Sequence, residues 1–218
     1  MRLLNRTITL ISVCFAVLIG CDKAIDAETL QERQGIFYEV NSTEPFTGTA
    51  VDLYENGQKR SERNFVAGKS EGLATSWHEN GQKQGEGNFV DGREDGLHSQ
   101  WYENGQKEGE GNFVDGERDG LYTHWDENGQ KLYEGNYVAG KPHGLTTNWY
   151  ANGQKQSEAN YADGKAEGVV TMWFENGQKQ SEANFVDGKP HGLTTKWDEN
   201  GQEPNEENWV DGELVDSE

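Results

Sequence analysis

Positive charge is scarce in this chain. Its 218 residues include 19 lysines and arginines against 39 aspartates and glutamates, so the formal net charge is −20. Such a chain would be repelled by a phosphate backbone and by an anionic lipid surface. The composition therefore argues against nucleic acid as a partner. It favours cationic partners, above all a protein with a basic surface.

Cysteine is also scarce, with only Cys14 and Cys21 present. Cys14 falls within an apolar stretch, residues 8–19, that follows Arg2 and Arg6. The stretch is too short for a transmembrane helix of about 20 residues and is typical of a secretory signal. Removal of this segment would leave a single cysteine, and hence no internal disulfide. The net charge would become −22 because both arginines leave with it.

The end of this signal resembles the lipobox of bacterial lipoproteins, in the residues Leu18-Ile19-Gly20-Cys21. The resemblance implies that residues 1–20 are a lipoprotein signal peptide and that Cys21 carries the lipid. Two or more acyl chains hold a protein on a membrane durably, at about 0.8 kcal/mol per buried CH₂. We therefore expect an anchored protein of the bacterial cell envelope, facing the periplasm or the outside. Residues 21–45 are expected to be a polar tether.

Residue types used in catalysis are present without the arrangement that catalysis needs. The five histidines show no ligand-like spacing, and the glycines fit turns better than a phosphate-binding loop. No serine lies in a nucleophile elbow. We predict a protein that is not an enzyme and has no cofactor and no metal site.

The strongest positive signal is a repeat of 24 residues, marked by the tripeptide Asn-Gly-Gln. It occurs seven times, beginning at Asn56, Asn80, Asn104, Asn128, Asn152, Asn176 and Asn200. A fixed period of this size marks a repeat array in which each unit covers its neighbour and no unit folds alone.

Each repeat carries two turn signals. In the second copy these are Asn80-Gly81 and Asp91-Gly92, and each separates two runs of alternating apolar residues. The pattern predicts an all-β protein, an open antiparallel β-meander of about seven two-stranded repeats over residues 46–214, followed by an acidic tail at 215–218. We expect a three-residue loop at both turns, with Gly81 left-handed and Trp77 opposite Lys83.

This register predicts that two aromatic rows share one face, which we interpret as the core. The first row is Trp77, Trp101, Trp125, Trp149, Trp173 and Trp197, and the second is Phe65, Phe89, Phe113, Tyr137, Tyr161, Phe185 and Trp209. A repeated glutamate, Glu86 in the second copy, falls on the opposite face, where each must lie near a cation or a backbone donor. We place a possible partner-binding patch on that polar face, because exposed aromatics among acids suit protein contact. Its residues are Tyr102, Tyr122, Tyr150, Met172 and Phe174.

The repeat resembles the bacterial variant of MORN repeats. The residues that carry the resemblance run from Trp77 through Asn80-Gly81-Gln82-Lys83 to the second turn, Val90 to Arg93. The resemblance covers about residues 46–212. It implies an open β-meander used as a scaffold or for protein contact, and some members of the family are described as antitoxins.

Together these observations predict a non-enzymatic, membrane-anchored repeat lipoprotein that acts as a protein-interaction or envelope scaffold module. Two alternatives remain. An antitoxin or immunity protein would neutralise one partner toxin. A carbohydrate- or ligand-binding module would use exposed tryptophans on the aromatic face. A second copy of the chain could also cover that face, which would give a homodimer.

Overall fold

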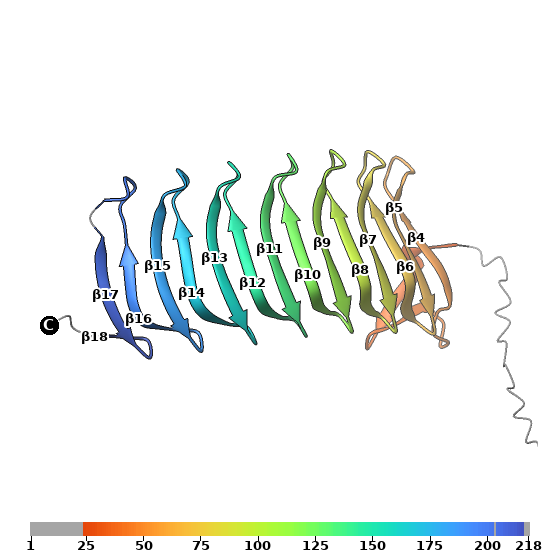
Figure 1. Ribbon diagram of the computed structural model, residues 1–218. Helices are drawn as coiled ribbons and strands as arrows, with labels where there is room; N and C mark the ends of the chain where they lie inside the picture. Colours follow the sequence, from red (N-terminus) through yellow and green to blue (C-terminus); the bar gives the residue numbers. More distant parts are fainter. Residues whose placement is uncertain (1–23, 203, 216–218) are drawn as a thin grey trace, which may run out of the picture.

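The computed structural model describes residues 24–202 and 204–215. It is an all-β protein whose main sheet has 16 strands, with consecutive strands side by side from β4 to β18 (Figure 1). This confirms the expected open antiparallel meander. The strands of the array are β4 (Gly48–Leu53), β5 (Lys59–Val66), β6 (Lys69–Trp77), β7 (Lys83–Val90), β8 (Arg93–Trp101), β9 (Lys107–Val114), β10 (Glu117–Trp125), β11 (Lys131–Val138), β12 (Lys141–Trp149), β13 (Lys155–Ala162), β14 (Lys165–Trp173), β15 (Lys179–Val186), β16 (Lys189–Lys196), β17 (Asn205–Val210) and β18 (Glu213–Val215).

The Asn-Gly turn has the expected three-residue loop. His78 donates its backbone N–H to the carbonyl of Gln82, and Gly81 has a φ of 85°. A left-handed residue at this position closes such a loop, and glycine adopts that conformation without steric cost. As expected, Trp77 pairs with Lys83.

Five of the seven Asn-Gly turns are also bound to the next one along the sheet by the asparagine side chain. The Asn80 carboxamide accepts a hydrogen bond from the Gln82 N–H at 2.9 Å and donates one to the Glu103 carbonyl at 2.7 Å. The Gln82 side chain lies against the turn glycine of the next repeat, where a Cβ on Gly105 would come within 2.5 Å of it. The recurring tripeptide therefore fixes its own turn and stacks it on its neighbour.

The Asp-Gly turn differs from the expectation. Val90 pairs with Arg93, so the loop has two residues, and Asp91 and Gly92 have φ values of 53° and 85°. Two left-handed residues define a type I′ turn, whose twist matches that of the flanking strands. Aspartate tolerates this conformation, so the turn does not need the longer loop.

A bulge after the Asn-Gly turn overturns the expected assignment of faces. Trp77 pairs with Lys83, but Ser76 pairs with Gly85, so Gln84 is an extra residue on β7. The extra residue places Trp77 on the face opposite Gly85. The two aromatic rows therefore lie on opposite faces of the sheet. We call these the tryptophan face, which also carries the repeated glutamates, and the phenylalanine face.

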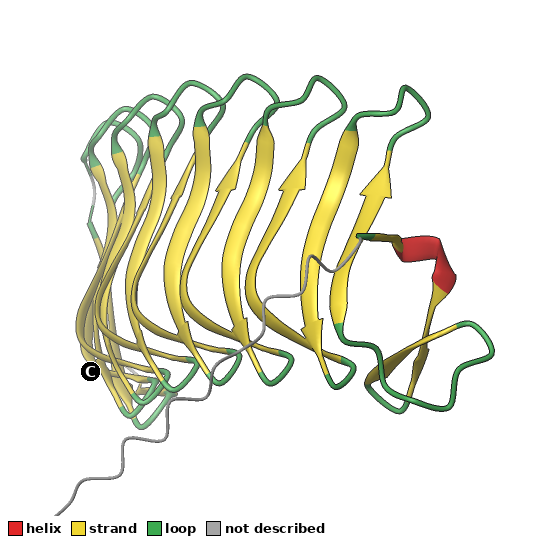
Figure 2. Ribbon diagram, turned by 90° about the vertical axis from the view of Figure 1, so that its right-hand side faces the viewer, coloured by secondary structure: helices red, strands yellow, loops and turns green. Residues whose placement is uncertain are grey.

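The N-terminal segment is folded in its described part, which corrects the expected tether. It contains β1 (Ile25–Asp26), the 3-10 helix η1 (Ala27–Thr29) and the hairpin β2 (Leu30–Arg33) and β3 (Ile36–Glu39). β1 pairs with β4 at the edge of the sheet. The segment packs on the hollow side of the curved sheet as a cap over its first strands (Figure 2).

The cap encloses the best-buried part of the protein. Phe65 is 4% exposed, and its ring lies 5.0 Å from that of Phe37 and 5.7 Å from that of Phe46. Beyond the cap, Ala159 is the only buried hydrophobic residue among those that the structure describes. The other aromatic residues of both rows are half-buried. The interpretation of an aromatic core was therefore wrong outside the capped end.

Replacing Phe65 with alanine should destabilise the capped end by about 3–5 kcal/mol, the usual cost of removing a buried phenylalanine side chain. Urea unfolding followed by tryptophan fluorescence measures the change. Phe185→Ala is the matched control, because Phe185 belongs to the same row but is half-buried and lies beyond the cap. Equal losses in the two variants would contradict the role assigned to the cap.

Candidate interaction surfaces

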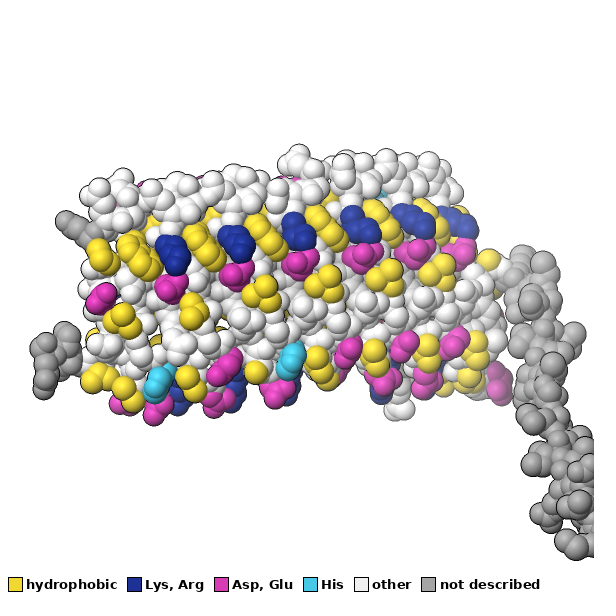
Figure 3. Space-filling model, in the orientation of Figure 1, with side chains coloured by type: hydrophobic (Ala, Val, Ile, Leu, Met, Phe, Trp, Pro, Cys, Tyr) yellow, Lys and Arg dark blue, Asp and Glu magenta, His cyan; other side chains and the backbone are white. Residues whose placement is uncertain are grey.

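The tryptophan face is a ladder of lysine, glutamate and tryptophan side chains. Lys107 donates to Glu110 of the same repeat at 2.5 Å, and its ammonium lies 6.0 Å from the ring centroid of Trp125 in the next repeat. A cation at this distance is attracted to the face of an indole ring. Rows of basic, acidic and hydrophobic side chains run along this face of the sheet (Figure 3). The same pair of contacts is made by Lys59, Lys83, Lys131, Lys155 and Lys179.

This ladder confirms that the repeated glutamates lie near cations. The hydrogen bond from Lys107 is the main cause that lowers the pKa of Glu110, and a second bond from Ser99 acts in the same direction. The lysines also cover part of each indole ring. The tryptophan row therefore serves contacts between repeats.

Three of the proposed partner-binding residues belong to the Asn-Gly turns. The Tyr102 hydroxyl donates to the Trp125 carbonyl at 2.8 Å, and the Tyr150 hydroxyl donates to the Trp173 carbonyl at the same distance. Phe174 occupies the equivalent position and is half-buried. Burial, with nearby carboxylates such as Glu108, raises the pKa of Tyr102. These side chains join one repeat to the next.

The other two residues lie on the phenylalanine face. Tyr122 pairs with Gly111 and Gly135, and Met172, which is 42% exposed, pairs with Ser157 and Ser181. The five residues therefore do not form the single patch expected from the sequence. Cys21, the expected site of lipidation, lies outside the described residues.

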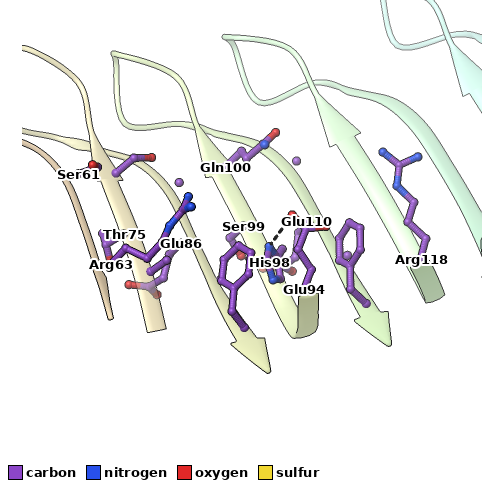
Figure 4. Close-up of a pocket in the computed structure, with 18 of the residues that line it drawn as sticks. Ser61, Arg63, Thr75, Glu86, Glu94, His98, Ser99, Gln100, Glu110 and Arg118 are labelled. Carbon is purple, nitrogen blue, oxygen red and sulfur yellow. Dashed lines mark hydrogen bonds and ion pairs between the residues drawn. The ribbon is translucent and has the colours of Figure 1, made fainter. Parts of the chain in front are cut away.

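A groove of about 310 Å³ lies on the phenylalanine face, between β5 and β10 (Figure 4). The rings of Phe89 and Phe113 flank His98, with centroid distances of 5.5 Å and 5.0 Å. Gly87 leaves the space for the imidazole, since a Cβ there would come within 2.2 Å of it. The middle of the groove is therefore an aromatic platform.

Two arginines border this platform. The Arg63 guanidinium lies 5.4 Å from the centroid of Phe89, and the Arg118 guanidinium lies 3.9 Å from that of Tyr122. Neither is ion-paired with a carboxylate among the residues that the structure describes. The carboxylate of Glu94, which also lines the groove, lies 3.5 Å from the His98 imidazole.

The groove was missed at the sequence level, although a signal was available. Arg63 stands where the next two repeats have Gly87 and Gly111, and His98 stands where the preceding repeat has Ala74. These residues differ from those at the equivalent positions of neighbouring repeats. Because the residues that the repeats share are enough to stack the units, the stacking does not explain these differences. Positions that depart from the repeat on one face are therefore candidates for recognition.

A comparison with known protein families agrees with the repeat of strands and turns in this structure. The MORN repeat variant matches residues 70–91, 94–115, 118–139, 142–163 and 166–187, which together make up half of the chain. The chain belongs to the MORN repeat variant family. Each matched stretch of this MORN-variant protein begins near the start of one strand, passes through an Asn-Gly turn and ends at the first residue of the following two-residue turn. That turn is Asp-Gly in four of the stretches and Ala139-Gly140 in the stretch 118–139. No curated protein matches the chain.

MORN repeats are generally modules for contact with proteins or membranes, and they are typically not enzymatic. Within the described ranges, no three histidine, cysteine, aspartate or glutamate side chains are grouped to hold a metal ion. The same part of the chain contains no helix that is long and apolar enough to span a membrane.

Replacing Lys107 with glutamine should raise the pKa of Glu110 toward its ordinary value, because the main hydrogen bond that lowers it is lost. A carboxyl group whose pKa is lower in the folded protein than in the unfolded protein stabilises the fold at pH values above its unfolded pKa. This stabilisation is lost as the pH falls through the pKa of the folded protein. The variant should therefore be less stable than the natural protein at pH 7, and the two should converge below about pH 4.

Carbon-detected NMR of the glutamate carboxyl groups and urea unfolding at both pH values would measure these changes. Lys141→Gln is the control, since Lys141 makes no ion pair with any residue that the structure describes. An unchanged titration of Glu110 in the Lys107 variant would show that the ladder does not hold this carboxylate.

Proposed function

We propose that this MORN-variant protein is a lipid-anchored interaction scaffold of a bacterial cell envelope. The observation that carries the proposal is a long sheet whose neighbour contacts are repetitive and whose phenylalanine face is open beyond the cap. A sheet of 16 strands at about 4.8 Å spacing is roughly 70 Å long before twist. Such a surface can reach and hold a partner at a distance from its anchor.

The lipobox-like sequence supports the anchor. Cys21 precedes Ile25, the first residue of β1, by four residues, and four residues span at most about 14 Å. An acylated Cys21 would thus hold the capped end of the sheet close to the membrane. The array would extend from there, with its C-terminal strands farthest along the chain from the lipid. The acidic surface disfavours further contact with anionic lipid.

The anchor is tested by comparing Cys21→Ser with Cys14→Ser, each expressed as the full chain. Serine at position 21 removes the thiol that would be acylated, so we expect the variant to leave the membrane fraction and to lose metabolically incorporated palmitate. Cys14→Ser alters only the segment that would be cleaved, and it should remain anchored. An acylated, membrane-bound Cys21 variant would overturn the proposed anchor.

The scaffold role is tested by crosslinking in the native envelope, followed by mass spectrometry of what the anchored protein captures. We expect one or a few proteins to be enriched over a lipoprotein of similar abundance. If the main captured protein is a toxin, the role is neutralisation and not scaffolding. If no protein is enriched, the interaction role is wrong and a purely structural part in the envelope is the better account.

A further inference from the structure

We propose that the groove between Arg63 and Arg118 binds an extended acidic peptide segment of a partner protein, with one carboxylate at each guanidinium and an apolar side chain between them. This inference rests on the proposed interaction function and assigns it a site and a ligand class. It differs from the partner expected from net charge, because here the contact would be made by acidic residues.

The proposal is supported first by the distribution of charged side chains around the groove. The chain is strongly acidic, yet both arginines at the borders of the groove lack a described carboxylate partner, whereas the lysines of the ladder have one. Arginine binds carboxylates through two parallel hydrogen bonds, and these are about twice as strong as neutral ones. At physiological salt, charges more than about 8 Å away are largely screened. Of the four glutamates that line the groove, three are paired with lysines of the ladder, namely Glu62, Glu86 and Glu110. The two guanidiniums, which have no described carboxylate partner, can therefore dominate binding in the groove despite the net charge.

The proposal is supported also by the distance between the two arginine sites. The Arg63 guanidinium lies over Phe89 on β7, and the Arg118 guanidinium lies over Tyr122 on β10. Three strand spacings and the offset along the strands separate these rings by roughly 15 Å. An extended peptide advances about 13 Å from one residue to the fourth after it, and every second side chain faces the same side. Carboxylates at positions i and i+4 would thus reach both guanidiniums, whereas a small monocarboxylate would reach only one.

The aromatic platform between the arginines provides a third support, because it offers an apolar contact to the middle of the peptide. A peptide bound this way directs the side chain at position i+2 toward Phe89, His98 and Phe113, where an aromatic or large aliphatic group can bury apolar surface. Glu94 lies beside His98 in the same place, so a third carboxylate is disfavoured there. The motif is therefore a five-residue segment with acidic residues at its first and fifth positions, an apolar residue at its third position, and any residue at the second and fourth. Three residues of the groove that differ from their equivalents in neighbouring repeats, Arg63, His98 and Arg118, each contact one part of this motif.

Fluorescence anisotropy with the full-length protein in detergent tests the proposal. The probes are labelled peptides with two glutamates around a central phenylalanine, separated by one, three or five residues. We expect the three-residue spacing to bind best, and Arg63→Ala and Arg118→Ala each to weaken it about tenfold or more. Arg93→Ala is the matched control, because Arg93 lies beside the Asp-Gly turn near Asp115 and does not line the groove. The affinity of this variant for the peptide should equal that of the natural protein. Circular dichroism and urea midpoints confirm that each variant is folded.

A peptide with glutamines in place of the glutamates should not bind measurably, and equal binding of the two would overturn the proposal. No binding at any spacing would overturn it as well, as would binding that both arginine variants retain. A lysine-containing peptide that binds in place of the acidic one would show that the partner is basic. Capture of an envelope protein by crosslinking, together with failure of every acidic peptide, would refute this site while leaving the interaction function intact.

Discussion

A sheet that has no second layer must be stabilised along its own length, and the rest of this structure follows from that constraint. Most domains bury one face of a sheet against another layer. Here the buried hydrophobic cluster found among the described residues lies under the N-terminal cap. Beyond it, each hairpin depends on its neighbours, through the strand hydrogen bonds, the Asn-Gly-Gln turns and the lysine, glutamate and tryptophan ladder. Stability in such an array is close to a sum of units and nearest-neighbour contacts.

The hairpins of the array and the positions of their turns could be predicted because both depend on local sequence, whereas β1, β18 and the β2–β3 hairpin were not expected. Asn-Gly and Asp-Gly fix where the chain reverses, and the three-residue loop at Gly81 follows from the conformation that glycine allows. The faces could not be predicted in this way. A single extra residue, Gln84, reverses which side of the sheet Trp77 occupies, and nothing in the alternation of apolar residues marks that bulge.

Tertiary contacts explain the other differences between expectation and structure. Residues 25–39 are polar enough to suggest a tether, but Phe37 supplies the apolar contact that holds them on Phe65. Tyr102 and Tyr150 suggest exposed recognition residues, but their hydroxyls reach backbone carbonyls in the next repeat. The repeat itself separates two kinds of position. Residues shared by the repeats build the sheet, whereas those of the phenylalanine face that differ between repeats shape the groove.

That separation connects the fold to the proposed function. The tryptophan face engages its charges internally, so its aromatic and acidic groups already have partners. The phenylalanine face has the groove, and Arg63 and Arg118 there make no ion pair with a carboxylate of the described part of the chain. A scaffold of this kind can vary its recognition residues without disturbing the contacts that stack the repeats. Under the proposed function, the cap would protect the end of the sheet that an acylated Cys21 holds.

The account is tested most directly by native-state hydrogen exchange, resolved strand by strand. Nearest-neighbour stabilisation with a cap at one end predicts an asymmetric profile. Backbone amides should remain protected from β4 through the middle of the sheet and lose protection progressively toward β17 and β18, which no described segment caps. Equal fraying at both ends would show that the cap does not stabilise the array. A single exchange rate for all strands would show that the sheet opens as one unit, and this would contradict stabilisation by neighbours.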